Sequence, residues 1–322
     1  MCVNTTVILN KKFLGSKKNG YKTIPCPNDK FKYIEIPCGK CYECRKKRAR
    51  EWSIRINEEI KGQQCDFVSF TFNNDELEKL ANEHNLNIEN NEDLNQIATI
   101  SIKRMLGRYR KKHKVSIKHW CITERGTKST ERLHIHGIFF NTLDRNYKNY
   151  WKYGNIYIGK YCNETTAAYV VKYMLKENEK HPEFRGKILT SAGIGKQFIN
   201  GRNEQCFNYE QTNEYYRFQN GTKCNLPKYY REKLYTEEQR YYLWEKIIDK
   251  GEKYIGGEKL INATEQEIAS LKKYYKNKYT QIHGDKYNEW DKQKAKRKHE
   301  KYIKHKKLYN LPSPPFLESK EG

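Results

Sequence analysis

Short runs of β-branched and aromatic residues, bounded by polar ones, recur through the middle of the chain. Residues 66–72, DFVSFTF, are the clearest run and predict a strand. Residues 116–124 and 133–141 predict two more strands, and the short polar connection between them favours antiparallel pairing. Residues 154–160, GNIYIGK, predict another strand. These runs together indicate a sheet.

Apolar residues at helical spacing mark the segments around these strands. After a Cys-rich turn that begins at Pro37, a stripe spaced three or four positions apart predicts a helix. The stripe consists of Ala49, Trp52, Ile56 and Ile60. A second amphipathic helix is predicted over 99–112, and a third follows Thr165 and Thr166. The order strand, helix, three strands, helix predicts an α+β fold with an antiparallel sheet of about five strands flanked by helices.

The chain divides by pattern into three parts. Residues 1–36 are mixed and mostly polar, and 37–235 hold the predicted sheet and helices. Residues 236–322 predict a basic, mostly helical region with a flexible tail. Within it, 292–307 is dense in Lys and Arg, and such a run is typical of a solvated helical face or a backbone-binding arm.

Charge and composition narrow the function. Of 322 residues, 63 are Lys or Arg and 39 are Asp or Glu, a net charge of +24, and 26 are Tyr. A basic chain rich in aromatics can meet phosphates and stack bases, so these counts favour nucleic-acid binding. No apolar run is long enough for a membrane span, and the N-terminus does not predict a signal peptide. The ten Cys are therefore expected in a reducing cytosol, as thiols or metal ligands. No phosphate-binding Gly loop and no GxSxG motif occurs.

The sequence LHIHGIFF carries the sharpest chemical signal. On a strand His134 and His136 share one face, and two adjacent imidazoles form a metal platform. Glu124, at the end of the preceding strand, could complete a mixed site for Mg²⁺ or Mn²⁺. Gly137 is expected to leave space beside the pair for a substrate backbone. The bland interpretation is two solvated His and a surface Glu124 paired with Arg125 or Arg132.

Two overlapping Tyr-x-x-Lys repeats follow in the predicted third helix. Tyr169 and Tyr173 lie four positions apart, and Lys172 and Lys176 follow each Tyr by three, so all four can share one helical face. A phenol is a poor nucleophile at neutral pH, and a nearby ammonium favours the phenolate. The bland interpretation is ordinary amphipathic packing with Tyr at the boundary.

Three cysteines follow Pro37 at the spacing of half a zinc knuckle. Cys38, Cys41 and Cys44 are each separated by two residues. A structural zinc needs four ligands, and Cys26 or Cys65 could supply the fourth. The bland interpretation is small buried thiols in a tight turn.

These motifs, in this order, resemble the HUH endonuclease superfamily and its rolling-circle replication initiators. The closer resemblance is to the replication initiators of microviruses, the gokushovirus-like branch of small single-stranded DNA phages. It extends over residues 37–235 and includes PCGKCYECR, CITERG, the His-x-His strand, the paired Tyr, SAGIG and LPKYYREK. The resemblance implies an HUH endonuclease-like core.

The resemblance also implies roles for the residues. His134 and His136, with Glu124, would hold a divalent cation that polarises the scissile phosphate. Tyr169 or Tyr173 would attack it, leaving a 5′-phosphotyrosine and a free 3′-OH, with Lys172 and Lys176 as helpers. The second Tyr would serve strand rejoining.

The implied partners are single-stranded and replicative-form DNA at an origin and the host helicase and DNA polymerase, in the cytoplasm of a bacterial host, with no membrane. One rival hypothesis keeps the chemistry and changes the role, to a plasmid or transposon HUH nickase. Two further rivals are not enzymes: a non-catalytic basic single-stranded DNA-binding protein with a Cys-rich zinc module, and a DNA-packaging protein. The combination of His-x-His with two Tyr-x-x-Lys repeats favours the enzyme over both.

Overall fold

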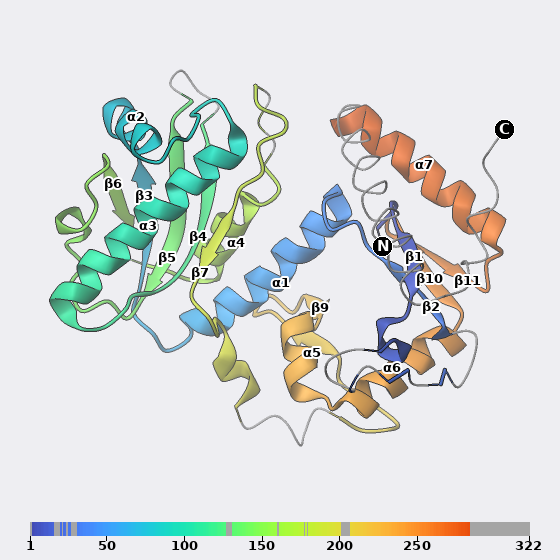
Figure 1. Cartoon of the computed structure of the whole chain (residues 1–322). Coiled ribbons are helices and arrows are strands. Elements are labelled where there is room, and N and C mark those ends of the chain that lie inside the picture. The colour runs from blue at the N-terminus through green and yellow to red at the C-terminus, as the bar shows by residue number, and fades with distance from the viewer. Residues whose placement is uncertain are drawn as a thin grey trace. The chain divides into compact units, whose positions relative to one another are not determined.

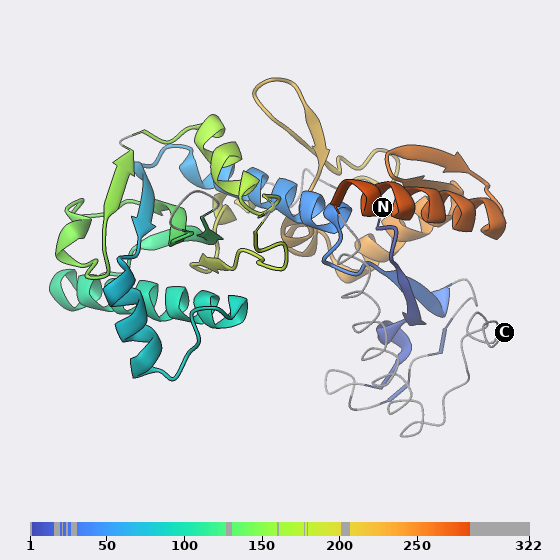
Figure 2. The same ribbon diagram turned by 90° about the horizontal axis from the view of Figure 1, so that it is seen from above.

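A computed structural model provides the fold, and its ribbon is drawn in Figures 1 and 2. It describes residues 2–283 apart from 16–19, 21, 24, 27–30, 127–130, 160, 177, 179 and 201–206. The basic run 292–307 and the predicted flexible tail therefore lie outside the described residues. Within the described ranges, no helix combines the length and apolarity that a membrane span requires.

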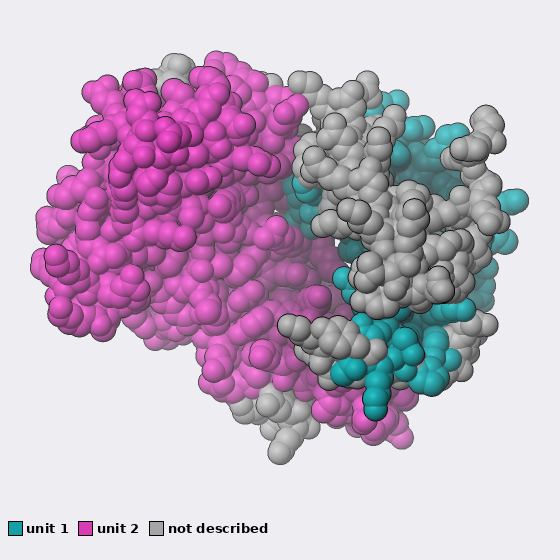
Figure 3. Space-filling view, in the orientation of Figure 1, with its two compact units in different colours: residues 1–45, 246–322 teal, residues 46–245 magenta. Residues whose placement is uncertain are grey.

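The chain forms two compact units (Figure 3). One unit consists of residues 46–245, and the other of residues 1–45 together with 246–322. The long helix α1, Tyr42–Ile60, begins in the second of these units and continues in the first. Each unit has its own buried apolar cluster.

The unit 46–245 is built on a five-stranded sheet in the order β6-β3-β5-β4-β7. Every neighbouring pair in this sheet is antiparallel. The strands are β3 (Cys65–Thr71), β4 (Lys118–Arg125), β5 (Leu133–Phe140), β6 (Ile156–Gly159) and β7 (Ile188–Thr190). The predicted α+β fold with an antiparallel sheet is confirmed, and β4 and β5 pair as the short polar connection predicted.

Helices cover both faces of this sheet. The first apolar cluster joins one face to α2 (Asn74–Glu83) and α3 (Asn91–His113), and Figure 1 shows α3 running across that face. The second cluster joins the other face to α1 and α4 (Glu164–Lys172). Because side chains alternate along a strand, each strand contributes to both clusters. Figure 2 shows the sheet between α3 and α4.

The rest of this unit is a smaller cluster around the buried Tyr230. Its elements are the hairpin β8 (Tyr215–Arg217) and β9 (Lys223–Asn225), α5 (Lys228–Leu234) and the start of α6 (Glu237–Asp249). Short 3-10 helices lie at Tyr147–Asn149 and Lys196–Ile199.

The other unit contains two hairpins and a helix. Strand β1 (Thr6–Leu9) pairs with β2 (Tyr33–Ile36), a 3-10 turn lies at Lys11–Phe13, and β10 (Glu252–Ile255) pairs with β11 (Glu258–Ile261) before α7 (Glu265–His283). The β10–β11 hairpin interrupts the region predicted as mostly helical. Its turn is Gly256-Gly257, with φ of 59° and 101°, and Gly adopts these angles without a steric penalty.

Helix α4 is shorter than predicted. It begins after Asn163, whose side chain accepts a hydrogen bond from the Thr166 N–H in a capping box, so Asn163 rather than a Thr is the N-cap. It ends at Lys172, because tight bonds from Met174 to Val171 and from Leu175 to Lys172 follow. Lys176 therefore lies beyond the helix.

The expected space beside Gly137 does not exist. Gly137 points to the face opposite the His pair, where a Cβ would lie 2.5 Å from Sγ of Cys121 and 2.6 Å from the Trp120 carbonyl oxygen. This glycine allows β4 and β5 to pack closely, and its neighbours leave no space for a substrate backbone.

We expect Gly137→Ala to destabilise the protein by about 1–3 kcal/mol, because the added methyl group overpacks the centre of the sheet. Gly107→Ala is the matched control. A Cβ at Gly107 in α3 meets nothing within 4 Å, and Ala there should stabilise by about 0.5–1 kcal/mol. Urea unfolding of both variants measures the difference, and equal midpoints would contradict the packing argument.

Candidate functional site

The candidate site lies on the face of the sheet that α4 covers, near one end of β4 and β5. Glu124 and His134 are directly paired across these strands, and His136 follows on the same face. The Nε2 atom of His136 lies 2.6 Å from Oε2 of Glu124. The structure thus brings the three predicted metal ligands to one place. Glu124 contacts His136 rather than Arg125 or Arg132, and both Glu124 and His136 are largely buried.

Two hydroxyl groups on β3 orient the imidazoles. Ser69 is paired with His136 and Thr71 with His134, and each hydroxyl oxygen lies 3.0 Å from the Nδ1 atom of its partner. These bonds fix the rings and leave Nε2 as the nitrogen that can bind a metal. Sequence analysis missed both residues, although the alternation in VSFTF places their side chains on one face.

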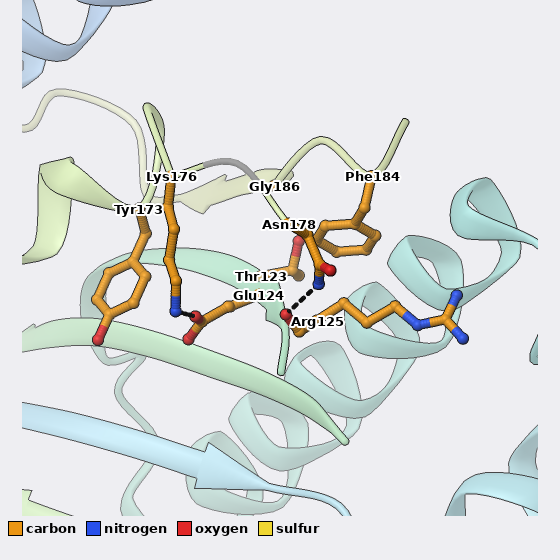
Figure 4. A pocket seen from close by; sticks show the side chains of 8 residues that line it. All are labelled: Thr123, Glu124, Arg125, Tyr173, Lys176, Asn178, Phe184 and Gly186. Carbon is orange, nitrogen blue, oxygen red and sulfur yellow. Dashed lines mark hydrogen bonds and ion pairs between the residues drawn. The ribbon is translucent and has the colours of Figure 1, made fainter. Parts of the chain in front are cut away.

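Glu124 also accepts a hydrogen bond from the ammonium of Lys176 (Figure 4). Burial by itself would raise the pKa of Glu124, but the hydrogen bonds with His136 and Lys176 outweigh it and lower that pKa. Burial and the neighbouring His136 lower the pKa of His134. An ionised carboxylate and a neutral imidazole are the forms that bind a metal.

The segment after α4 is anchored to β4 by Asn178. Its buried amide donates to the carbonyl oxygen of Arg125 at 2.9 Å, and its own oxygen accepts from the N–H groups of Lys180 and His181. This anchoring keeps Lys176 near Glu124 although Lys176 lies outside the helix (Figure 4). No local pattern in the sequence marks Asn178, because its partner is 53 residues away.

The two tyrosines lie against the His pair in unequal settings. The ring of Tyr173 stacks on that of His136 at 4.1 Å, with 7° between the planes. Tyr173 is 8% exposed and Tyr169 is 41% exposed, yet their hydroxyl oxygens are 2.7 Å apart. Burial, and then the hydrogen bond to Tyr169, raise the pKa of Tyr173.

Both lysines lie close to the phenol rings. The Nζ atom of Lys172 is 3.8 Å from the ring centre of Tyr169 and 5.4 Å from that of Tyr173. The Nζ atom of Lys176 is 5.8 Å from the ring centre of Tyr173. The predicted grouping of two phenols and two ammonium groups therefore exists, although only part of it lies on a helix.

A second cluster, in the unit that contains β1 and β2, consists of four cysteines. Its members are Cys2, Cys38, Cys41 and Cys44, whose sulfur atoms all lie within 4.8 Å of one another. The fourth member is Cys2, so the expected fourth ligand, Cys26 or Cys65, was wrong. Pairing of β1 with β2 brings Cys2, which precedes β1, next to Cys38, which follows β2.

The thiols are arranged as a metal site requires. The backbone N–H groups of Lys40 and Cys41 donate to Sγ of Cys38, and that of Cys38 donates to Sγ of Cys2. Hydrogen bonding with Cys2 lowers the pKa of both Cys38 and Cys41, that of Cys41 to about 7. Four thiols this close could bind a soft metal such as zinc.

Comparison with known proteins identifies the segment that carries the first site. Residues 65–178 match the model of a family described as replication-associated protein ORF2, and this range includes both His, Glu124, both Tyr and both Lys. The chain is 26% identical over 228 residues to the replication-associated protein VP4 of Bdellovibrio phage phiMH2K. The match covers 61% of this chain and 66% of that protein, slightly less than two thirds. No solved structure matches. Residues 65–178 therefore carry the domain of this replication-associated protein family, and the predicted resemblance to microvirus replication initiators is confirmed.

Proposed function

We propose that this protein initiates rolling-circle DNA replication by nicking one strand at an origin and later rejoining it. The observation that carries the proposal is the grouping of Tyr169 and Tyr173 against His136 and Glu124 on one face of the sheet. A phosphodiesterase that forms a covalent intermediate needs a nucleophile, a cation site and nearby positive charge. All three are present within this one group of side chains.

His134, His136 and Glu124 are the residues that would hold a divalent cation. Two imidazole nitrogens and a carboxylate oxygen suit Mg²⁺ or Mn²⁺ once water or a phosphate oxygen completes the coordination. Such a cation would polarise the scissile phosphate and stabilise the charge of its transition state. Ser69 and Thr71 hold the imidazoles in the binding orientation, and Lys176 keeps Glu124 ionised.

A tyrosine oxygen would attack the phosphorus atom while the bond from phosphorus to the 3′ oxygen breaks. The phenol loses its proton, and the leaving oxygen takes one up to become the 3′-OH. Lys172, 3.8 Å from the Tyr169 ring centre, favours the phenolate and offsets phosphate charge. The 5′-phosphotyrosine conserves the bond energy, so rejoining needs no ATP.

Two phenols at one site suit two successive strand transfers. The hydroxyl oxygens of Tyr169 and Tyr173 are 2.7 Å apart, so both can approach one phosphate position. One Tyr would hold the first 5′ end while the other cleaves the regenerated origin. The released 3′-OH would then close the first strand into a circle.

The partners follow from this chemistry. The substrate is single-stranded or replicative-form origin DNA, and the first 3′-OH would prime a host DNA polymerase behind a host helicase, in the cytoplasm of a bacterial host. The phage relative favours this role over a plasmid or transposon nickase. The net charge of +24 with the four-cysteine cluster supports a second candidate, a non-catalytic single-stranded DNA-binding protein.

The first prediction concerns the covalent bond. With Mn²⁺ or Mg²⁺ and end-labelled single-stranded DNA that spans the origin, the protein should form an SDS-resistant adduct on a denaturing gel. The double variant Tyr169→Phe/Tyr173→Phe should form none, because it lacks both phenol oxygens. Tyr215→Phe, at an exposed Tyr on β8, is the matched control and should form the adduct normally. Nicking by the double variant, or DNA binding without any nick, would favour the second candidate.

The second prediction concerns the hydroxyl groups on β3. Ser69→Ala and Thr71→Val should each weaken Mn²⁺ binding by about 10- to 100-fold, because each removes the partner that orients a ligating imidazole. Thr71→Ser keeps the hydroxyl and should retain affinity. Calorimetry on the Tyr169→Phe/Tyr173→Phe background measures binding independently of cleavage. Unchanged affinity in both variants would refute the metal role of the His pair.

The third prediction concerns the four cysteines, which we infer hold one structural Zn²⁺. The purified protein should contain about one zinc per chain, since four thiolates satisfy a closed tetrahedral site. Cys2→Ser should lower both the zinc content and the melting temperature, because the metal joins the segment before β1 to the start of α1. Cys26→Ser, outside the cluster, is the matched control. Metal-free protein with the wild-type melting temperature would overturn the assignment.

A further inference from the structure

An aromatic side chain is exposed on the catalytic face at the edge of the sheet. Tyr157 on the edge strand β6 is paired with Ser69 on β3, so its side chain lies on the same face as that of Ser69. Ser69 in turn contacts His136. Tyr157 is 65% exposed, which is far more than the phenols of Tyr169 and Tyr173. A large exposed ring next to a candidate active site is available to a substrate.

Phe67 connects Tyr157 to the candidate nucleophile. The ring centre of Phe67 lies 6.2 Å from that of Tyr157 and 5.6 Å from that of Tyr169, both edge to face. Its ring is also nearly parallel to that of His136, with 12° between the planes. A row of aromatic rings therefore runs from the edge of the sheet to the tyrosine that would attack the phosphate.

The two sides of the His pair differ in chemistry. On the β4 side lie the carboxylate of Glu124 and the ammonium of Lys176, which suit a cation and a phosphate. On the β6 side lie the rings of Phe67 and Tyr157. A nucleotide has the same two parts, because its phosphate is charged and its base is a flat aromatic ring that stacks on Tyr or Phe.

We propose that Tyr157, supported by Phe67, stacks on a base of single-stranded DNA next to the cleaved phosphate. This inference rests on the proposed function for its substrate. The strand would follow the catalytic face from the edge at β6 toward Glu124, with a phosphate at the tyrosines and a neighbouring base on Tyr157. Stacking tolerates any base, so Tyr157 would contribute affinity and position rather than sequence choice.

The test measures binding without cleavage. On the Tyr169→Phe/Tyr173→Phe background, fluorescence anisotropy with a short labelled oligothymidine measures affinity at several salt concentrations. Tyr157→Ala should weaken binding about tenfold, the typical effect of losing one stacked base. Tyr157→Phe and Tyr157→Trp should bind as well as the parent, because each keeps a ring. The slope of affinity against salt should stay the same in Tyr157→Ala, since phosphate contacts are unchanged.

Tyr215→Ala is the matched control, because this Tyr is 56% exposed in the same unit but lies on β8, outside the five-stranded sheet. It should bind as tightly as the parent. Equal affinity of Tyr157→Ala and the parent would overturn the proposal and leave this edge to a protein partner. Equal losses in Tyr157→Ala and Tyr157→Phe would also overturn it, because the contact would then be through the hydroxyl group. The adduct assay stands apart, so a binding loss without any adduct would retain the stacking site and reject the nuclease.

Discussion

Antiparallel pairing of β5 with β3 on one side and β4 on the other is the constraint on which the core and the candidate site depend. Because side chains alternate, one register places His134 and His136 on the same face as Glu124 and the two hydroxyl groups of β3. A slip of one residue would turn the slipped strand's polar groups into the apolar cluster under α3. The core and the site therefore specify the same register, and neither can change alone.

Helix α4 is positioned by the same sheet face. Its buried Ala167, Val170 and Val171 fall three and four positions apart and pack on the second apolar cluster. That packing leaves Tyr169 at the boundary and places Tyr173 on the ring of His136. The helix then ends, and Asn178 holds the following segment so that Lys176 reaches Glu124. The apolar face of α4 thus fixes where the phenols lie.

Local periodicity made most of the sheet and the His–Glu–Tyr grouping predictable, because each strand and helix has its own pattern. The features that the sequence did not reveal depend on contacts between distant residues. Cys2 joins the cysteine cluster only through pairing of two short mixed strands, and Gly137 is surrounded by a neighbouring strand. The end of α4 is not marked either, since YMLK continues a good helical pattern. The basic run 292–307 lies outside the described residues, so its helical prediction stays a prediction.

The two candidate metal sites differ in the softness of their ligands, and this difference would keep their metals apart. Zinc binds most N, O and S sites more tightly than Mg²⁺ or Mn²⁺ does, so the His–Glu site alone could not exclude it. Four closely packed thiols offer zinc a far better set of ligands, with backbone N–H groups that favour the thiolate forms. One zinc ion per chain would then fill the cysteine site first. The His–Glu site, with the ammonium of Lys176 competing for its carboxylate, would be left to the abundant hard cations that can bind and leave with each phosphate.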